Sequence, residues 1–547
     1  MAIIEKPDST HKEGPPAVEA AGSSGPARPA EGGLAGRVAG VTLLLAVLTL
    51  LGKAIGFLRQ VVVAGAYGTG SDLDAYLVAA AIPDMAATMA LFVSLNLFLP
   101  LYTSERERSP ESAGRLAAAF LARASLLLLG VSCFLVFAAG AIVTAIAPEL
   151  DPRLHAVATE SLRLLAFLVL FRGVEGTLRG LLHAHRRFAL PGVAGLFMSL
   201  VIVLCVLGFS DRLGVLALGW GTLLGYLLPL LIILPLALAV VPALTRLRAG
   251  SHPLLGEVKR LVPWVVAIEA ASLLLPIIDR SVASRFLPSG RISALSYGRL
   301  VSEVPFDLVG ITLATTLFPE FAALHARGDV EGFRRILRRG IRATVAVMLP
   351  VSALLVVLSR PVTRAIFERG AFDAQATGLT GDALWAFSLG LPFLCAAVLV
   401  TQAAYAARKL RRILAVKLVA LVLKIGISLV LLPVLGHAGI ALGSSVFFAV
   451  VLVGLLPVTV GGWRGLVPSP PVLLAATAVA AVSGWGLTAL VEAAGVTRGV
   501  PFLGAELGIW AVAALVYFGI CRLGRVEEIL WVERLVVRRI FGKEGGW

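Results

Sequence analysis

Charged side chains recur inside apolar segments of this sequence, and several of them share one face of a predicted helix. Lys53 and Arg59 lie six residues apart in the first such segment. Arg172, Glu175 and Arg179 follow one another at spacings of three and four, which places all three on one helix face. A charged side chain in the middle of a bilayer costs at least about 2.5–3.5 kcal/mol, so each one is a candidate for function.

Three later apolar segments repeat this pattern. Their charged residues are Glu269, Asp279 and Arg280, then Arg299, Glu303 and Asp307 at spacings of four, and finally Lys417 and Lys424 seven residues apart. One interpretation is that these charges form buried ion pairs or reach the membrane interface. The other is that Arg and Lys from several helices line a hydrated cavity and bind a pyrophosphate, because guanidinium groups match phosphate oxygens. The number of clusters on shared faces favours the cavity.

The composition shows that the surroundings of these charges are lipid. Of 547 residues, 58% are hydrophobic and 15% are charged, and the mean hydropathy is +0.92, whereas soluble domains carry about 25% charged residues. A soluble globular protein is therefore excluded. About fourteen apolar segments are long enough to cross a bilayer, and their continuous apolar character predicts helices rather than a barrel. Their limits are 38–65, 74–102, 116–147, 157–182, 189–209, 213–243, 258–286, 292–322, 334–358, 380–407, 413–433, 438–461, 470–492 and 503–523.

The connections between the segments predict the orientation. With the amino terminus inside, the even-numbered connections hold about twenty Lys and Arg residues and the odd-numbered ones about eight. The positive-inside rule then places both termini in the cytoplasm. This distribution accounts for much of the formal net charge of +15 without a nucleic-acid partner.

The two ends of the chain differ from the apolar segments. Residues 1–36 are rich in Pro, Gly, Ala, Ser and Glu, which predicts a disordered tail. Residues 527–541 mix apolar residues with Glu and Arg at helical spacing, which predicts an amphipathic helix on the inner leaflet. The phosphate-binding pattern GxxxxGK[ST] is missing, and we expect no cofactor, no metal site and no catalytic residue. Bends are expected at the prolines within spans, namely Pro83, Pro276, Pro305 and Pro392.

Five runs of sequence together carry a family likeness. They are GKAIGFLRQVVVAGAYGTGSDLDAYLVAAAIP (52–83), SGRISALSYGRLVSEVPFDLVGITLATTLFPEFA (289–322), FERGAFDAQAT (367–377), YAARKLRRILAVKL (405–418) and GHAGIALGSS (436–445). In this order they resemble the MurJ/MviN family of lipid II flippases, within the multidrug/oligosaccharidyl-lipid/polysaccharide exporter superfamily. The likeness covers essentially the whole membrane portion.

The resemblance implies an all-α membrane protein with two six-helix lobes that form a V around a central cationic cavity. The lobes would be residues 37–246 and 247–465, followed by two helices (466–524) that form a groove for the lipid tail and by the amphipathic tail (525–547). Such a protein is a transporter and not an enzyme. It would move undecaprenyl-pyrophosphate-linked peptidoglycan precursor, lipid II, from the inner to the outer leaflet of the bacterial cytoplasmic membrane. Alternating access would be driven by membrane potential or an ion gradient rather than ATP, and the cell-wall synthesis machinery is a partner that the resemblance allows.

The family's site residues can be carried over position by position. Lys53 and Arg59 match two basic cavity positions of the first helix, with Lys53 in place of the more usual Arg. Asp74 matches the acidic residue that begins the second helix, and Arg299 matches the basic cavity residue of the eighth. The charged clusters described above, and not the family pattern, supply the candidates for coupling or gating, which are Glu175, Asp279, Arg280, Glu303 and Lys424.

The second helix departs from the family pattern. After Pro83 the family usually continues with an Asn, a pair of Arg residues and a Glu-Gly, whereas this chain reads DMAATMALFVSLN and has Ala87 and Thr88 at the basic positions. We hypothesise that Arg172 and Arg179 supply the missing charge from the fourth helix. The departure also leaves open a second cargo class, another undecaprenyl-linked oligosaccharide such as an exopolysaccharide or O-antigen unit.

Lys424 is a second departure. Related transporters tend to carry small polar residues near a cation site on this helix. We hypothesise that the Lys424 ammonium acts as a tethered cation and removes any sodium requirement. The alternative is that it pairs with a neighbouring carboxylate.

Overall fold

The computed structural model describes residues 51–246, 252–461, 470–497 and 499–529. Within these ranges the regular structure is helical and includes no strand, which confirms the all-α prediction. The predicted disordered tail and most of the predicted amphipathic tail helix lie outside the described residues.

The first part of the chain forms one group of helices, which we call the amino-terminal group. It begins with a helix over residues 51–67 and continues with α2 (Ser71–Val93), the π-helical turn η1 (Ser94–Phe98), α3 (Leu99–Arg108), α4 (Pro110–Phe137), α5 (Ala139–Ile146), α6 (Pro152–Leu165), α7 (Leu168–Ala184), α8 (Ala189–Leu213), α9 (Leu216–Val240) and the 3₁₀ turn η2 (Pro242–Arg246).

The second part forms the carboxy-terminal group and a final helix pair. The group comprises α10 (Leu255–Leu273), α11 (Leu275–Phe286), α12 (Arg291–Pro305), the π-helical turn η3 (Phe306–Gly310), α13 (Ile311–Ala326), α14 (Val330–Val357), α15 (Ser359–Phe367), α16 (Ala374–Leu389), α17 (Leu391–Ala406), α18 (Leu410–Leu435) and α19 (His437–Thr459). The final pair is α20 (Pro470–Ala493) and α21 (Gly499–Leu523).

The described residues include 11 helices that are long and apolar enough to cross a membrane, or up to 13 if each of two bent pairs counts as one span. These coincide with the last thirteen predicted segments. The first predicted segment, 38–65, begins outside the described residues, so the predicted count of fourteen is not tested. The bent pairs are α10 with α11, at 40°, and α16 with α17, at 46°. Pro276 and Pro392 stand in the first turn of α11 and α17, which confirms the bends predicted there.

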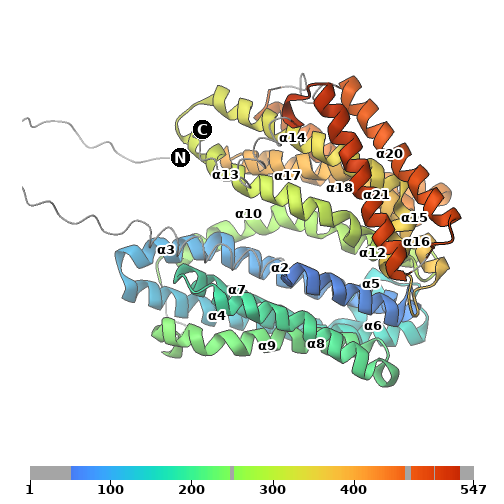
Figure 1. Cartoon of the computed structure of the whole chain (residues 1–547). Helices are drawn as coiled ribbons and strands as arrows, with labels where there is room; N and C mark the ends of the chain where they lie inside the picture. The colour runs from blue at the N-terminus through green and yellow to red at the C-terminus, as the bar shows by residue number, and fades with distance from the viewer. Residues whose placement is uncertain (1–50, 247–251, 462–469, 498, 530–547) are drawn as a thin grey trace, which may run out of the picture. The chain divides into compact units, whose positions relative to one another are not determined.

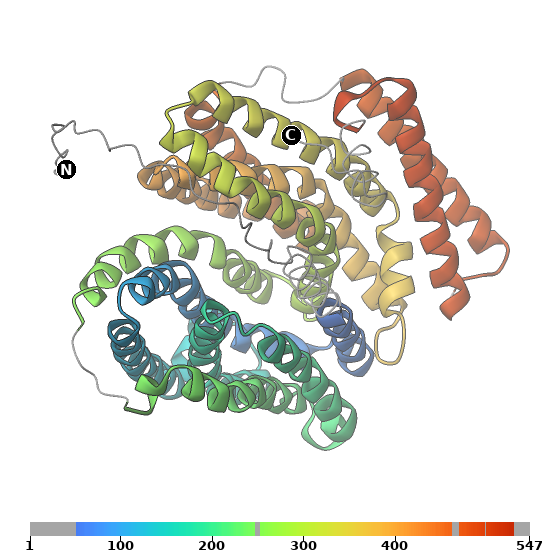
Figure 2. The ribbon, with the colours of Figure 1, turned by 60° about the vertical axis from the view of Figure 1, so that its left-hand side comes forward.

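Buried apolar side chains hold each group together, and α10 contributes to both. Figures 1 and 2 show α10 between the two groups. Leu255 and Val258, at the start of α10, pack in a cluster with Phe120 and other residues of the amino-terminal group. Ile268, three turns later, packs instead with Leu337 and other residues of the carboxy-terminal group. The helix that follows the connection between the groups is therefore anchored at both ends.

The two groups are also joined at the beginning of α2 and α12. The buried carboxylate of Asp74 accepts hydrogen bonds from the backbone N–H of Gly290 at 2.5 Å and of Ser293 at 2.7 Å. Gly290 has a φ of +89°, and a Cβ there would stand 2.7 Å from the carbonyl oxygen of Thr69, so only glycine fits. Nearby, the N–H of Ala371 donates to the carbonyl oxygen of Gly65 at 2.8 Å. Hydrogen bonds to backbone groups thus join the two helix groups near the beginning of α2 and α12.

The final pair, α20 and α21, packs against α14 (Figure 1). The Tyr517 hydroxyl donates to the carbonyl oxygen of Ala346 at 2.5 Å. At the other end of the pair, Arg364 forms an ion pair with Glu492 at 2.5 Å. These contacts attach the pair to one side of the carboxy-terminal group.

We predict that Asp74→Ala destabilises the fold. The change leaves two buried N–H donors without an acceptor, and each unpaired donor costs about 1–3 kcal/mol. Thermal unfolding of the purified protein in detergent should show a clear loss. Asp382→Asn is the control, because its ion pair with Arg360 is largely exposed and should matter little. Equal stability of the two variants would contradict the role of Asp74.

Candidate functional site

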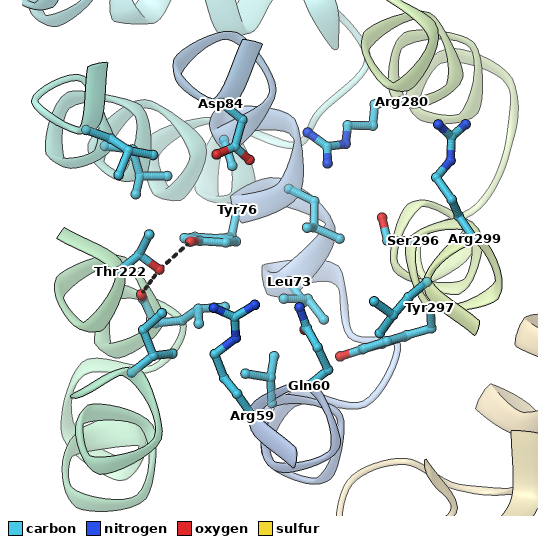
Figure 3. A pocket seen from close by; sticks show the side chains of 18 of the residues that line it. Arg59, Gln60, Leu73, Tyr76, Asp84, Thr222, Arg280, Ser296, Tyr297 and Arg299 are labelled. Atoms are coloured by element: carbon cyan, nitrogen blue, oxygen red, sulfur yellow. Dashed lines mark hydrogen bonds between the residues drawn. The ribbon is translucent and has the colours of Figure 1, made fainter. Parts of the chain in front are cut away.

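A cavity of about 350 Å³ lies between the amino-terminal and carboxy-terminal groups. One side is formed by the 51–67 helix, α2 and α9, with single residues from α6, α7 and α8. The other side is formed by α11 and α12 (Figure 3). Most of its wall is apolar, with contributions such as Leu73, Leu165 and Ile202. The remaining lining residues are polar or charged, and polar groups that converge in a concave pocket are typical of a ligand site.

Three arginines line this cavity. Arg59 comes from the first helix, Arg280 from α11 and Arg299 from α12. Figure 3 shows the guanidinium of Arg280 directed toward Asp84 and that of Arg59 directed into the same space. The Nη1 atom of Arg280 and the hydroxyl of Tyr297 are buried without a hydrogen-bond partner among the described residues. Because a buried polar atom without a partner costs free energy, both atoms call for water or a ligand in the cavity.

Neutral polar groups line the same space. They include Gln60 and Ser296, and the hydroxyls of Tyr76 and Thr222, which lie 3.1 Å apart. Hydroxyl and amide groups can exchange hydrogen bonds with a sugar, while guanidinium groups bind phosphate. The cavity can therefore accept a ligand that is anionic at one point and rich in hydroxyls elsewhere.

The acidic residues of the cavity are Asp84 and Glu303. Arg172, which stands behind the cavity wall on α7, lies 3.8 Å from Asp84 and 5.5 Å from the centre of the Tyr226 ring. Arg172 therefore reaches the cavity through Asp84 and not by lining it.

Asp279 connects the cavity to helices behind it. Its Oδ2 accepts from Arg299 at 2.5 Å, and its Oδ1 accepts from Lys424 on α18. Ser444 on α19 donates to Asp279 at 3.4 Å. Lys424 is completely buried. One carboxylate thus pairs with two cations, a cavity arginine and a lysine that lies outside the cavity. Lys424 therefore pairs with a neighbouring carboxylate, which is the alternative that the sequence left open.

The other residues predicted from the sequence do not line the cavity. Lys53 pairs with Asp307 of η3 at 2.9 Å, and both side chains are more than 40% exposed. Arg179 donates through Nε to Glu175 of the same helix at 2.8 Å. Asp74 lies at the contact between α2 and α12 described above. These placements do not test a role in transport, so the predicted roles of these residues stay predictions.

Sequence reasoning missed several residues of the cavity. Asp84 could have been found by the criterion that selected the other candidates, because it is a charged residue inside an apolar segment. Ser296 was also accessible, since it precedes Arg299 by three residues and shares its helix face. Gln60, Tyr76, Thr222, Tyr226 and Tyr297 gave no signal, because such residues are common in membrane helices of every kind.

The described residues offer no candidate for a bound metal. No group of three or more His, Cys, Asp or Glu side chains in the ranges given above could hold an ion.

Comparison with known structures identifies the fold. The structure of a lipid II flippase MurJ in an inward closed conformation superposes with a TM-score of 0.72 at 19% identity, covering 88% of this chain and 98% of that one. A multidrug resistance MATE family transporter of the MOP superfamily, in an inward-facing conformation, gives a TM-score of 0.59 at 15% identity, covering 73% of this chain and 93% of that one.

Comparison of sequences identifies the family. The probable lipid II flippase MurJ of Synechocystis sp. is 26% identical over 471 residues, which cover 82% of this chain and 87% of that protein. The lipid II flippase MurJ of Burkholderia cenocepacia is 26% identical over 409 residues, covering 73% of this chain and 79% of that protein. The family model described as lipid II flippase MurJ matches residues 63–505, which is more than half of the chain. The chain therefore belongs to the lipid II flippase MurJ family.

Proposed function

We propose that this protein flips lipid II, an undecaprenyl-pyrophosphate-linked peptidoglycan precursor, from the inner to the outer leaflet of the bacterial cytoplasmic membrane. The observation that carries the proposal is the cavity between the two helix groups, where Arg280 keeps a buried Nη1 atom without a partner. A pyrophosphate offers the acceptors that this atom and the guanidinium groups of Arg59 and Arg299 require. The neighbouring hydroxyls suit the sugar.

The direction of access follows from the contacts between the groups. The distribution of Lys and Arg favours cytoplasmic termini, so the 51–67 helix would run outward and end near the external surface. The contacts of Asp74, Gly290 and Ala371 would then close the external end of the cavity. This arrangement corresponds to a state that takes cargo from the inner leaflet, and separation of these contacts would open the cavity to the outside.

Asp279 allows Arg299 to change its partner when cargo binds. When the pyrophosphate pairs with Arg299, that arginine must leave Asp279, and a buried carboxylate without a partner is costly. Lys424 keeps Asp279 neutralised during the exchange because it contacts the other carboxylate oxygen. The ammonium then takes the place that a bound cation would fill, and transport would need no sodium. Membrane potential supplies about 2.3 kcal/mol for each charge moved through 100 mV.

The relatives reported above favour lipid II over the second cargo class. Expression of the chain in a bacterium depleted of its own lipid II flippase distinguishes the two. Rescue of growth supports lipid II. Failure to rescue, with the protein present in the membrane at normal amount, would instead indicate another undecaprenyl-linked oligosaccharide.

We predict that Arg59→Gln and Arg280→Gln each lower transport at least about tenfold, because each removes a charged hydrogen bond to the phosphate, worth about 1.5–3 kcal/mol. Rescue of the depleted strain measures the effect, with membrane levels measured by immunoblot. Arg153→Gln is the matched control, since this arginine is 72% exposed and outside the cavity. Normal rescue by both cavity variants would contradict the proposed site.

We predict that Arg172→Ala lowers transport about tenfold, because Asp84 would then present an uncompensated negative charge to an anionic cargo. Asp84→Asn should restore part of the activity in the double variant, since it removes that charge. Transport by Arg172→Ala at the level of the unmodified protein would count strongly against a role for Arg172.

We predict that the unmodified protein transports equally well with and without sodium. Lys424→Met should abolish transport or make it depend on sodium, because Asp279 then lacks its buried cation. Lys417→Met is the matched control: Lys417 lies on the same helix and pairs with Glu269 at 3.8 Å, away from the cavity. The measurement is lipid II flipping in vesicles of defined salt. Sodium-dependent transport that survives Lys424→Met unchanged would refute the tethered-cation idea.

A further inference from the structure

A second pocket, of about 490 Å³, lies where α10 crosses α2 and α4. Its walls are almost entirely apolar, and Met89, Phe120, Leu128 and Val262 are typical of them. No residue lines both this pocket and the central cavity. Its volume is within the range of about 300–1,000 Å³ that is usual for ligand sites.

The pocket opens toward the lipid-facing surface of the amino-terminal group. Leu127, one of its lining residues, is 68% exposed, and its neighbour Leu126 is 71% exposed. Exposed leucines on a membrane helix face acyl chains, because lipid is the solvent there. A molecule of the bilayer can therefore enter the pocket from the side.

Two cations are the charged residues among those that line the pocket. Arg123 comes from α4 and Lys259 from α10. Among the side chains that the structure describes, neither forms an ion pair, and none of those that line the pocket is a carboxylate. Two cations beside an apolar pocket attract an amphiphile with a negative head and a hydrocarbon chain.

The position of these cations matches the head-group region of the inner leaflet. Lys259 lies in the second turn of α10, next to the connection that the positive-inside rule assigns to the cytoplasm. A hydrogen bond of 3.1 Å between Ser112 and His252 brings the start of α4 to the same level. Arg123 lies three turns further along α4, on the side of the hydrocarbon. Lys259 thus lies near the interface, and Arg123 lies deeper, where its long side chain can extend toward the head group.

We propose that this pocket binds an anionic diacyl phospholipid of the inner leaflet. Arg123 and Lys259 hold its phosphate, and one acyl chain fills the apolar part between α10 and α4. A phospholipid fits better than the polyprenyl chain of the cargo, because the pocket has no residue in common with the cavity where the cargo pyrophosphate would lie. Phospholipid is also the amphiphile that surrounds the opening at the highest concentration.

The bound lipid would stabilise the position of α10. The first turns of this helix pack in the amino-terminal group and its later turns pack in the carboxy-terminal group. A lipid between α10 and α4 adds apolar contacts between the first turns of α10 and the amino-terminal group. Anionic phospholipid should therefore favour the present arrangement of the groups over one in which the start of α10 has moved away.

The test uses the purified full-length protein in detergent, with phosphatidylglycerol or phosphatidylcholine added. Native mass spectrometry measures the bound lipid, and thermal unfolding measures its effect on stability. We expect phosphatidylglycerol to bind more tightly than phosphatidylcholine and to raise the unfolding temperature. Arg123→Gln and Lys259→Gln should each weaken phosphatidylglycerol binding about fivefold, as expected for one cation near an anionic head group. Arg260→Gln is the matched control, because Arg260 adjoins Lys259 but does not line the pocket.

A second variant tests the apolar part. Val262→Trp should fill the pocket and reduce lipid binding while Arg123 and Lys259 remain. Equal losses in Arg260→Gln and Lys259→Gln would overturn the proposal, because they would mean general attraction to a basic surface. Displacement of phosphatidylglycerol by a smaller amount of undecaprenyl phosphate would also overturn it and would make the cargo chain the occupant. Arg59→Gln should leave phosphatidylglycerol binding unchanged, so failure of the proposed transport function and failure of this proposal are distinguishable.

Discussion

A charge that leaves water for the interior of a membrane must find an opposite charge or a polar ligand, and this constraint organises the whole molecule. Several charged side chains inside the described helices meet it by pairing within the protein. Arg179 pairs with Glu175, Lys417 with Glu269, and Asp279 with both Arg299 and Lys424. Cations that line a pocket without such a pair among the described residues, such as Arg59 and Arg280, therefore mark candidate sites for an anionic ligand.

The same constraint separates the two pockets by their chemistry. Arg59 and Arg280 line the central cavity together with hydroxyls and carboxylates, which suits a phosphate that carries sugars. Arg123 and Lys259 line a pocket that otherwise presents hydrocarbon, which suits a phosphate that carries acyl chains. In both proposals the cations would supply the affinity for phosphate, and the neighbouring side chains would supply the distinction between ligands.

The sequence predicted the helices better than it predicted the site, for a physical reason. The length of an apolar segment is set by the thickness of the bilayer, so a local pattern suffices to place a helix. A partner across helices is not encoded locally. The spacing of Arg172 and Arg179 revealed their shared face, but it could not reveal that one reaches Asp84 and the other pairs within its own helix. Asp74 illustrates the same limit, because its partners are backbone N–H groups more than two hundred residues away.

In the proposed mechanism, the two cation contacts of Asp279 would allow a cavity arginine to change its partner from this carboxylate to the cargo. A carboxylate with a single cation would resist the loss of that cation, since the remaining charge would be buried and unpaired. Asp279 has two cations on different oxygens, and only Arg299 faces the cavity. Arg299 could therefore turn to a phosphate while Lys424 remains with Asp279. The free-energy cost of the exchange would then be the difference between the Arg299–Asp279 pair and the Arg299–phosphate pair. In the proposed mechanism, a change of partner at Arg299 would also change the contact between α11, α12 and α18, which meet at this carboxylate. Cargo binding would thereby be coupled to movement of the carboxy-terminal group.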